Sequence, residues 1–349
     1  MQIFFRVDAS NQIGSGHVQR CLTLAEQLKQ KGAEIHFIIN KQKGNMEAEI
    51  RRQYSVYFIE CMISQGQELD AEQTVSVLRE INRKVDLLIV DHHQLSVQWQ
   101  NKVKPLVEKL MVIDDLANRK HNCDLLLDQN YYKDYRSRYK DLVPASCRQL
   151  LGPKYLLLRP EFNNVNRNLR KNESIERLLI CYGGADPTNE TEKVLTALKK
   201  YSMVDKFIID VVVGSNYINV ARIKQLCSEI NANLHYNINY MATLIAKADL
   251  AFGAGGVSMW ERCYLGLPSV VTIVADNQSR AVNDATDKPF VINLGWHHNV
   301  NVQDYYELIN RLTVNLDDLK KIREKLVHFI NQIDQHKCVV AEEIIALIS

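Results

Sequence analysis

A histidine within a glycine-rich stretch near the amino terminus is the residue whose type and setting best suit catalysis. The stretch reads RVDASNQIGSGHVQR over residues 6–20 and places His17 directly after Gly16. Histidine is the most common general acid–base residue, and the dipole of a helix starting here would favour the neutral imidazole that a base needs. We therefore predict that His17 is a general base. The alternative is that it only caps or packs the helix.

A strand and a helix are expected to position this histidine. Residues 2–7 form an apolar run rich in aromatic and β-branched side chains, and apolar residues recur at helical spacing over 18–28. A strand, a turn and a helix in this order begin a doubly wound α/β sheet, whose ligand sites lie at the carboxyl ends of the strands. Gly14 and Gly16 would allow the backbone to take positive φ there and let a ligand approach closely.

Length and composition limit the class of protein. A chain of 349 residues is too long for one core, so two domains are expected. A net charge of +2 gives no electrostatic case for nucleic acid or a membrane surface as a partner. The eight cysteines show no CxxC spacing, which favours buried thiols over a zinc site or a disulfide framework. With no signal peptide and no run of membrane length, the chain is expected to be cytoplasmic.

The first half of the chain alternates strands with helices, which predicts a parallel sheet covered on both faces. Strands are expected at 2–7, 34–39, 55–59, 86–90, 111–113 and 124–127, and helices at 69–85 and 95–110. Polar clusters follow three of these strands, namely Asp91-His92-His93, Asp114-Asp115 and residues 128–131. They are expected on the side of the sheet that holds the site, unless they only cap helices and form turns.

The second half repeats this alternation after a polar segment over 163–174, where we place the domain boundary. Strands are expected at 177–182, 207–213, 250–252 and 269–273, and helices at 190–201, 241–248 and within 316–349. Two similar α/β domains with a cleft between them are the simplest assembly. The predicted domains are 1–165 and 175–315, both Rossmann-like, followed by the helical tail 316–349.

Two glycine-rich turns in the second half could present backbone amides to phosphate. Gly183 and Gly184 follow one expected strand, and residues 253–258 (GAGGVS) follow another. Neither turn matches GxGxxG and no Walker motif occurs, so a dinucleotide or P-loop site is poorly supported. Two such turns in one domain favour a nucleotide phosphate site, although the glycines could serve only tight turns.

Three further residues are candidates for ligand binding, and two of them also have a structural interpretation. Glu261 could accept hydrogen bonds from ribose hydroxyls, or it could form a capping box with Ser258, three residues earlier. Asn277 could bind a sugar hydroxyl or amide. Arg159 could bind an anion in the cleft, or it could form a surface salt bridge.

Longer motifs make the chain recognisable. In order, they read RxDASxxIGxGHxxR, VIDDLANRxHxCDLLLDQN, GPxYLLLRPEF, GGADPTN and GAGGVSMWERCYLGLPSVVxxxADNQ. Together they resemble the PseG family of UDP-sugar hydrolases, which acts in pseudaminic acid biosynthesis. The resemblance runs over about residues 1–300 and weakens beyond them.

The resemblance implies a GT-B fold of the MurG type, with two parallel sheets facing a central cleft and the tail packing back toward the first domain. It implies inverting, metal-independent hydrolysis of UDP-2,4-diacetamido-2,4,6-trideoxy-β-L-altropyranose to UDP and the free sugar, with no cofactor. It also places catalysis at His17, Glu261 near the ribose and Asn277 near the sugar or diphosphate. The residues predicted to bind substrate or UDP are Asp8, Gly14, Gly16, Arg20, Arg159, Gly183, Gly184, Asp186, Gly255, Gly256, Val257, Ser258, Glu261 and Asn277.

Two other functions are weighed against hydrolysis. A glycosyltransferase of the same fold would use an acceptor hydroxyl in place of water, and fold alone does not separate the two. A nucleotide-sugar binder without activity is a third possibility, against which the intact His17 argues. We expect a monomer or a weak oligomer whose partner is the UDP-sugar, without nucleic acid or membrane insertion.

Overall fold

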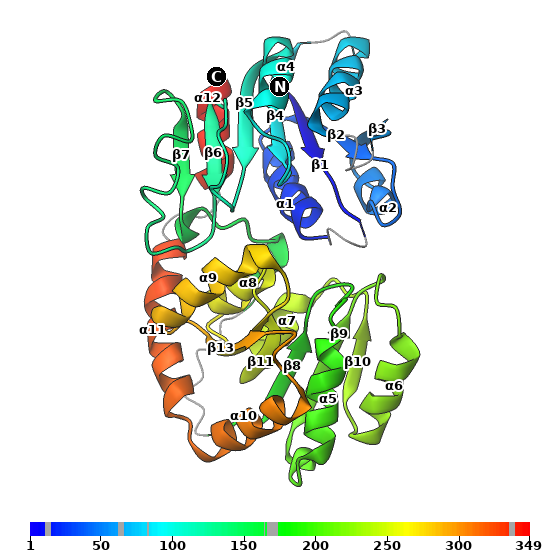
Figure 1. Cartoon of the computed structure of the whole chain (residues 1–349), viewed down its shortest axis with the longest axis vertical. Helices are drawn as coiled ribbons and strands as arrows, with labels where there is room; N and C mark the ends of the chain where they lie inside the picture. Colours follow the sequence, from blue (N-terminus) through cyan, green and yellow to red (C-terminus); the bar gives the residue numbers. More distant parts are fainter. Residues whose placement is uncertain (11–14, 62–65, 82–83, 164, 166–173, 335–338) are drawn as a thin grey trace. The chain divides into compact units, whose positions relative to one another are not determined.

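The structure is a computed structural model that describes residues 1–10, 15–61, 66–81, 84–163, 165, 174–334 and 339–349. Its contacts divide the chain into two compact units. Unit 1 comprises Met1–Leu157 and His336–Ser349, and unit 2 comprises Leu158–Gln335. Each unit is a parallel sheet with helices packed against it (Figure 1), which confirms the predicted α/β class.

Unit 1 contains a seven-stranded parallel sheet in the order β3-β2-β1-β4-β5-β6-β7. Its strands are β1 (Gln2–Val7), β2 (Glu34–Asn40), β3 (Ser55–Ile59), β4 (Val85–Asp91), β5 (Val107–Ile113), β6 (Leu125–Asp128) and β7 (Arg148–Leu151). The strands are rich in Ile, Leu, Val and Phe because a parallel sheet is buried on both faces. The packed sheet holds the polar residues at the carboxyl ends of its strands in defined positions.

The helices of unit 1 cover the two faces of this sheet. They are α1 (Gly16–Gln30), α2 (Glu47–Arg51), α3 (Gly66–Glu80), α4 (Val97–Val103) and α12 (Val339–Ile348). Ile3 and Phe5 pack into a core with α1 and α12, whereas Phe4 packs into the opposite core with α3 and α4. Alternate residues of β1 therefore face different cores, as expected for a strand.

Unit 2 contains a six-stranded parallel sheet in the order β10-β9-β8-β11-β12-β13. Its strands are β8 (Arg177–Cys181), β9 (Ile208–Val213), β10 (Asn233–Tyr236), β11 (Leu250–Ala254), β12 (Ser269–Ile273) and β13 (Ile292–Trp296). Its helices are α5 (Glu190–Lys200), α6 (Val220–Glu229), α7 (Met241–Lys247), α8 (Val257–Tyr264), α9 (Asp276–Asp287), α10 (Val302–Val314) and α11 (Asp317–Asp334).

The ends of two predicted helices are wrong. The helix expected at 95–110 ends at Val103, and a 3₁₀ turn over Lys104–Leu106 leads into β5. Pro105 explains this change, since proline lacks the N–H that an α-helix needs and its ring clashes with the preceding turn. The helix expected at 69–85 is α3, which ends at Glu80 before β4 begins.

The units do not divide the chain where the polar segment 163–174 suggested a boundary. The division falls after Leu157, and most of that segment lies outside the described residues. Within the tail, α11 belongs to unit 2 and α12 to unit 1. Val340 and Ile344 of α12 are buried in the core that α1 lines.

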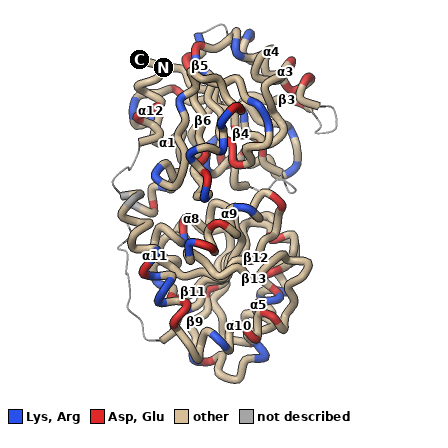
Figure 2. The backbone as a smooth tube through the Cα atoms, turned by 60° about the vertical axis from the view of Figure 1, so that its left-hand side comes forward, with Lys and Arg blue, Asp and Glu red and all other residues tan. Residues whose placement is uncertain are grey.

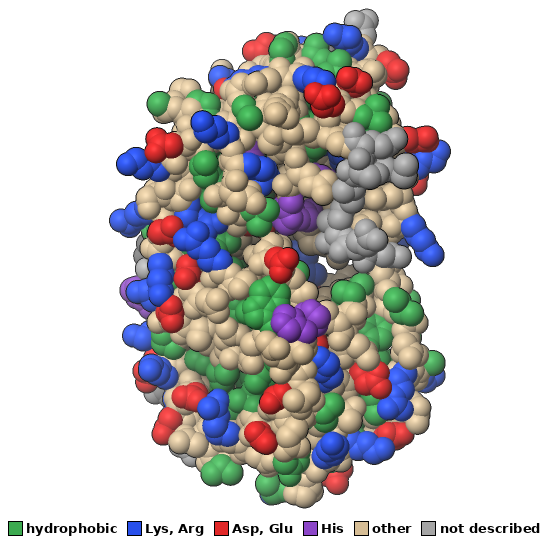
Figure 3. Space-filling view, viewed as in Figure 1, with side chains coloured by type: hydrophobic (Ala, Val, Ile, Leu, Met, Phe, Trp, Pro, Cys, Tyr) green, Lys and Arg blue, Asp and Glu red, His purple; other side chains and the backbone are tan. Residues whose placement is uncertain are grey.

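Charges of both signs are interspersed in each unit. Figure 2 shows Lys and Arg close to Asp and Glu along the backbone, and Figure 3 shows side chains of both signs over the face drawn. This mixture agrees with the small net charge of the sequence. Among the helices that the structure describes, none has both the length and the apolar character needed to cross a membrane.

Candidate active site

The side chain of His17 contacts an aspartate at the end of a neighbouring strand. His17 lies in the first turn of α1, which follows β1, and Asp91 is the last residue of β4, which pairs with β1. The Nδ1 atom of His17 is 2.6 Å from Oδ1 of the buried Asp91. Both residues therefore lie at the carboxyl ends of central parallel strands, where sites of such sheets form.

Arg20 fixes this carboxylate from one turn further along α1. Its Nε and Nη2 atoms each donate to Asp91 at 2.6 Å, and its Nη1 atom donates to Asp115 at 3.1 Å. Burial opposes ionisation of Asp91, but the charges and hydrogen bonds of Arg20 and His17 hold its pKa well below the usual range. Asp91 is therefore a carboxylate at neutral pH, held in a fixed orientation.

The hydrogen bond to Asp91 determines which nitrogen of His17 is free. Because a carboxylate only accepts hydrogen bonds, Nδ1 of His17 carries the proton and donates a hydrogen bond to Asp91. The Nη2 atom of Arg20 lies 3.0 Å from Nδ1, but both atoms donate to the same carboxylate oxygen. In the neutral ring Nε2 is left with its lone pair. This arrangement suits a general base.

A second histidine lies beside the first. The rings of His93 and His17 meet edge to face, with centroids 4.5 Å apart. The Nε2 atom of His93 is 2.9 Å from Oδ1 of Asp115. Burial lowers the pKa of His93, but the hydrogen bond and charge of Asp115 outweigh burial and raise it overall. Two His–Asp pairs are thus joined through Arg20.

Asp8 belongs to a separate buried network. Arg6 and Asp8 are two residues apart at the end of β1, so their side chains lie on the same face of the sheet. Arg6 Nη1 donates to Asp8 Oδ1 at 2.6 Å. Arg6 Nε also donates to Asp70 Oδ1 at 3.2 Å, and Trp99 Nε1 donates to that oxygen at 2.7 Å. Burial opposes ionisation of Asp8, but Arg6 lowers its pKa overall. Asp8 is therefore held as a carboxylate.

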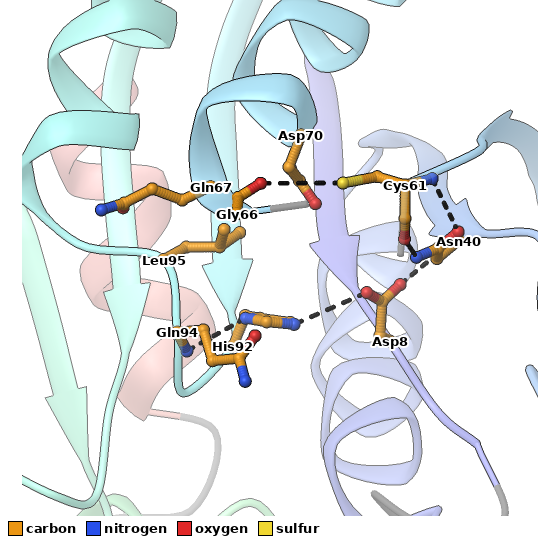
Figure 4. Close-up of a pocket in the computed structure, with 9 residues that line it drawn as sticks. All are labelled: Asp8, Asn40, Cys61, Gly66, Gln67, Asp70, His92, Gln94 and Leu95. Carbon is orange, nitrogen blue, oxygen red and sulfur yellow. Dashed lines mark hydrogen bonds and ion pairs between the residues drawn. The ribbon is translucent and has the colours of Figure 1, made fainter. Parts of the chain in front are cut away.

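A small pocket opens next to this network in unit 1 (Figure 4). Its empty volume is about 290 Å³, open solvent included, and six of its nine lining residues have polar side chains. The lining residues are Asp8, Asn40, Cys61, Gly66, Gln67, Asp70, His92, Gln94 and Leu95. Asp8 and His92 follow the paired residues Val7 and Asp91, which places the pocket beside the carboxylate that contacts His17.

His92 presents a donor to this pocket. Its Nδ1 accepts from the backbone N–H of Gln94 at 3.1 Å, so the proton of the neutral ring is on Nε2. That nitrogen faces Asp8 Oδ2 at 3.6 Å, a distance longer than a hydrogen bond. Burial and the charge of Arg6 lower the pKa of His92 to about 4. A neutral donor and a charged acceptor therefore face each other.

Of the two glycines before His17, the structure describes only one. Gly14 lies outside the described residues. Gly16 begins α1 with helical backbone and does not use the positive φ that glycine allows. A Cβ built on Gly16 would meet no described atom within 4 Å, so the space beside it is open.

In unit 2, the Gly183-Gly184 turn leads from β8 toward α5. Gly183 has a φ of +92°, and the carbonyl of Gly184 accepts from Gly214 N at 3.1 Å. Asp186 caps α5, since its carboxylate accepts from the N–H groups of Glu190 at 3.1 Å and Thr191 at 2.8 Å. These amides already have an acceptor, which makes the start of α5 a weaker anion site than its glycines suggested.

The second turn joins β11 to α8. Gly256 is the N-cap of α8 and, because it has no side chain, it makes no capping hydrogen bond to the first amides of the helix. Gly255 N donates to Gln278 Oε1 at 3.1 Å, and a Cβ on Gly255 would lie 2.2 Å from a methyl of Val282. Only glycine fits there. Val257 and Ser258 form the first turn, where backbone amides favour an anion.

Glu261 and Arg159 contact each other. Arg159 Nε and Nη2 donate to the two carboxylate oxygens of Glu261 at 3.0 and 3.2 Å, and Arg159 Nη1 pairs with Glu161 at 2.7 Å. The capping-box interpretation of Glu261 is wrong, because Gly256 and not Ser258 is the N-cap. Asn277 is exposed in the first turn of α9. The ligand contacts predicted for these residues stay predictions.

The sequence placed Asp91, His93 and Asp115 on the side of the sheet that holds the site, but it did not indicate that they surround His17. The available signal was their position after strands, in the clusters that follow β4 and β5. Within the described residues no group of three or more His, Cys, Asp or Glu side chains is placed to hold a metal ion.

The fold resembles those of solved glycosyltransferases. The crystal structure of MurG from Acinetobacter baumannii aligns with a TM-score of 0.66 at 13% identity, covering 98% of this chain and 99% of that chain. The calicheamicin glycosyltransferase CalG4 aligns with a TM-score of 0.62 at 13% identity, covering 99% and 98%. These likenesses define the chain as an α/β protein with the GT-B fold.

Sequence relatives define the family more closely. The UDP-2,4-diacetamido-2,4,6-trideoxy-β-L-altropyranose hydrolase of Campylobacter jejuni is 32% identical over 240 residues, covering 68% of this chain and 77% of that protein. The chain therefore belongs to the family of this hydrolase. The spore coat polysaccharide biosynthesis protein SpsG of Bacillus subtilis is 27% identical over 299 residues, covering 84% of each protein. No protein-family model matches the sequence.

Proposed function

We propose that this chain is a UDP-sugar hydrolase that releases UDP from UDP-2,4-diacetamido-2,4,6-trideoxy-β-L-altropyranose or a closely related nucleotide sugar. The observation that carries this proposal is the pair of His17 and Asp91, 2.6 Å apart, in a chain of this family. The pair supplies a base of defined orientation. A base is what direct attack by water on an anomeric carbon requires.

In this mechanism water attacks C1 of the sugar on the face opposite the nucleotide. The proton of the water passes to Nε2 of His17 as its oxygen bonds to C1, and the electrons of the broken C1–O bond stay on the phosphate oxygen of UDP. Asp91 stabilises the imidazolium through Nδ1–H. The product sugar has inverted configuration at C1. UDP is a good leaving group, so the reaction needs no strong general acid.

Unit 2 would hold the nucleotide. The uncapped start of α8, with Gly256, Val257 and Ser258, offers amide donors to the diphosphate without a metal ion. Glu261 would accept from ribose hydroxyls with the lone pairs that Arg159 leaves unused, because an ionised carboxylate can accept about four hydrogen bonds.

Unit 1 would hold the sugar. The pocket beside Asp91 offers the Nε2–H of His92 as a donor and Asp8 as an acceptor, across a gap of 3.6 Å that a polar sugar substituent could bridge. Arg20 contributes indirectly, since it positions Asp91.

A glycosyltransferase is the second candidate function. The likeness in fold to MurG and to the calicheamicin glycosyltransferase favours it, although fold does not fix function. The same base would then take the proton of an acceptor hydroxyl.

UDP release from the diacetamido-altrose nucleotide, measured without an acceptor and with EDTA present, separates these candidates. We expect rapid release, and proton NMR before mutarotation should show inverted configuration. Release only after an acceptor is added would establish the transferase instead. Loss of the rate in EDTA, restored by magnesium, would contradict the metal-independent mechanism. No turnover under any condition, with UDP still bound, would indicate a binding protein.

A further inference from the structure

Arg262 is a buried cation beneath the turn that leads into α8. Its side chain is on the last turn of the helix, and the residue is only 2% exposed. The guanidinium donates from Nε to Ser269 Oγ at 3.0 Å, from Nη1 to Ser258 Oγ at 3.3 Å and from Nη2 to Ala254 O at 2.9 Å. All three acceptors are uncharged.

No carboxylate of the described residues forms an ion pair with Arg262, although the charge of the neighbouring Glu261 acts on its guanidinium. Across the part of the chain that the structure describes, no acidic side chain lies within ion-pair distance of this guanidinium. The adjacent Glu261 is engaged by Arg159 instead. Burial lowers the pKa of Arg262, but arginine remains charged in proteins. Burial of a cation without a counter-ion is unfavourable, so a bound anion would relieve it.

The position of Arg262 directs its charge to the turn. A Cβ on Gly253 would lie 2.7 Å from Arg262 Nη1, so the guanidinium lies against the last residues of β11, just before the turn. Ser258 Oγ accepts from Arg262, which leaves its own O–H free to donate elsewhere. Arg262 thus orients the Ser258 hydroxyl as a donor in the first turn of α8.

We propose that Arg262 is the buried counter-charge for the diphosphate of the nucleotide, acting through Ser258 and the turn without contacting the ligand. It is a positioning residue, and the inference rests on the proposed nucleotide site at α8. A purely structural role would be to tie α8 to β11 and β12 through Ala254 and Ser269. The two roles differ in which ligands they affect.

Binding of UDP, UMP and uridine by calorimetry distinguishes these roles. In Arg262→Met we expect UDP affinity to fall by about 10-fold, because the diphosphate loses a nearby counter-charge, with a smaller fall for UMP and no change for uridine. Arg262→Lys should recover part of the UDP affinity. Thermal unfolding shows whether Arg262→Met is folded, because loss of the guanidinium leaves the buried Ala254 carbonyl and Ser269 hydroxyl without this donor and is expected to destabilise the protein.

Two further variants keep the test decisive. Ser258→Ala, which changes a partly exposed residue, should lose UDP affinity but not uridine affinity even if Arg262→Met does not fold. Arg311→Met, on the exposed surface of α10, is the matched control and should bind UDP normally.

Unchanged UDP affinity in folded Arg262→Met and in Ser258→Ala would overturn the inference while leaving the proposed function intact. An equal fall for UDP and uridine would also overturn it, since that result indicates only structural damage. Failure of the unaltered protein to bind UDP would overturn the nucleotide site itself, and the inference with it.

Discussion

Asp91 Oδ1 lies 2.6 Å from Nδ1 of His17, although the two residues are 74 positions apart in the sequence. The parallel pairing of β1 with β4 creates this contact, because it brings the end of β4 next to the start of α1. The buried carboxylate keeps the proton of the neutral ring on Nδ1 and Nε2 available as a base. The proposed chemistry of His17 therefore depends on Asp91.

Replacing Asp91 with asparagine tests whether the activity of His17 depends on the carboxylate that orients its ring. The amide has the shape of the carboxylate but can donate to Nδ1, which favours the wrong tautomer, and it removes the charge that stabilises the imidazolium. We expect kcat to fall by about 10²- to 10⁴-fold with little change in UDP affinity. Steady-state kinetics and calorimetry of Asp91→Asn measure both quantities.

Asp86→Asn is the matched control, because Asp86 is on the same strand, at its opposite end, where it accepts from the backbone N–H of Gln2 at 2.7 Å. It should retain the normal kcat. An Asp91→Asn variant with full kcat would show that His17 does not need this carboxylate.

Removing the carboxylate of Glu261 should weaken nucleotide binding. If Glu261 accepts from ribose, Glu261→Ala should reduce UDP affinity by an amount on the order of 1.5–3 kcal/mol, the range for a charged hydrogen bond. Glu161→Ala is the control, since Glu161 also pairs with Arg159, at 2.7 Å, but has no proposed ligand. Equal UDP affinities in both variants would mean that Glu261 serves only to hold Arg159.

His92 should make the fold sensitive to acid. Its pKa is about 4 in the folded state and about 6.5 when unfolded, so the unfolded chain binds the extra proton between these values. Stability should therefore fall as the pH drops from 7 to 4, with His92 contributing about 3 kcal/mol of the loss.

Urea unfolding of His92→Gln at several pH values measures this contribution. The variant should lose about 3 kcal/mol less than the unaltered protein over the same range, whereas His298→Gln, at an exposed position, should not differ from the unaltered protein. Identical pH profiles for His92→Gln and the unaltered protein would contradict the neutral state of His92 in the fold.

Local patterns predicted most strands but missed the edge strands β7, β10 and β13, and they did not indicate which residues pair. The apolar runs identified the central strands, and the rule for strand ends put Asp91 and Asp115 on the side of the sheet where His17 lies. The choice of Asp91 over Asp8 as the partner of His17 depends on packing. The side chain of Asp8 lies on the same strand face as that of Arg6, two residues earlier, and forms an ion pair with it.

Such local rules do not predict contacts between residues that are distant in the sequence. Arg159 and Glu261 are 102 positions apart, and nothing in either motif indicates that they contact each other. The S-x-x-E spacing suggested a capping box instead, but the helix begins at Val257, so Ser258 is already inside it.

The most direct test of the central claim is turnover of the nucleotide sugar by His17→Ala, measured together with UDP affinity. We expect UDP release without an acceptor to become undetectable while UDP still binds normally, because the base is lost and the nucleotide site proposed in unit 2 is unchanged. His298→Ala, an exposed histidine of unit 2, should keep the normal rate. A His17→Ala variant that retains most of its rate would show that another group activates the water.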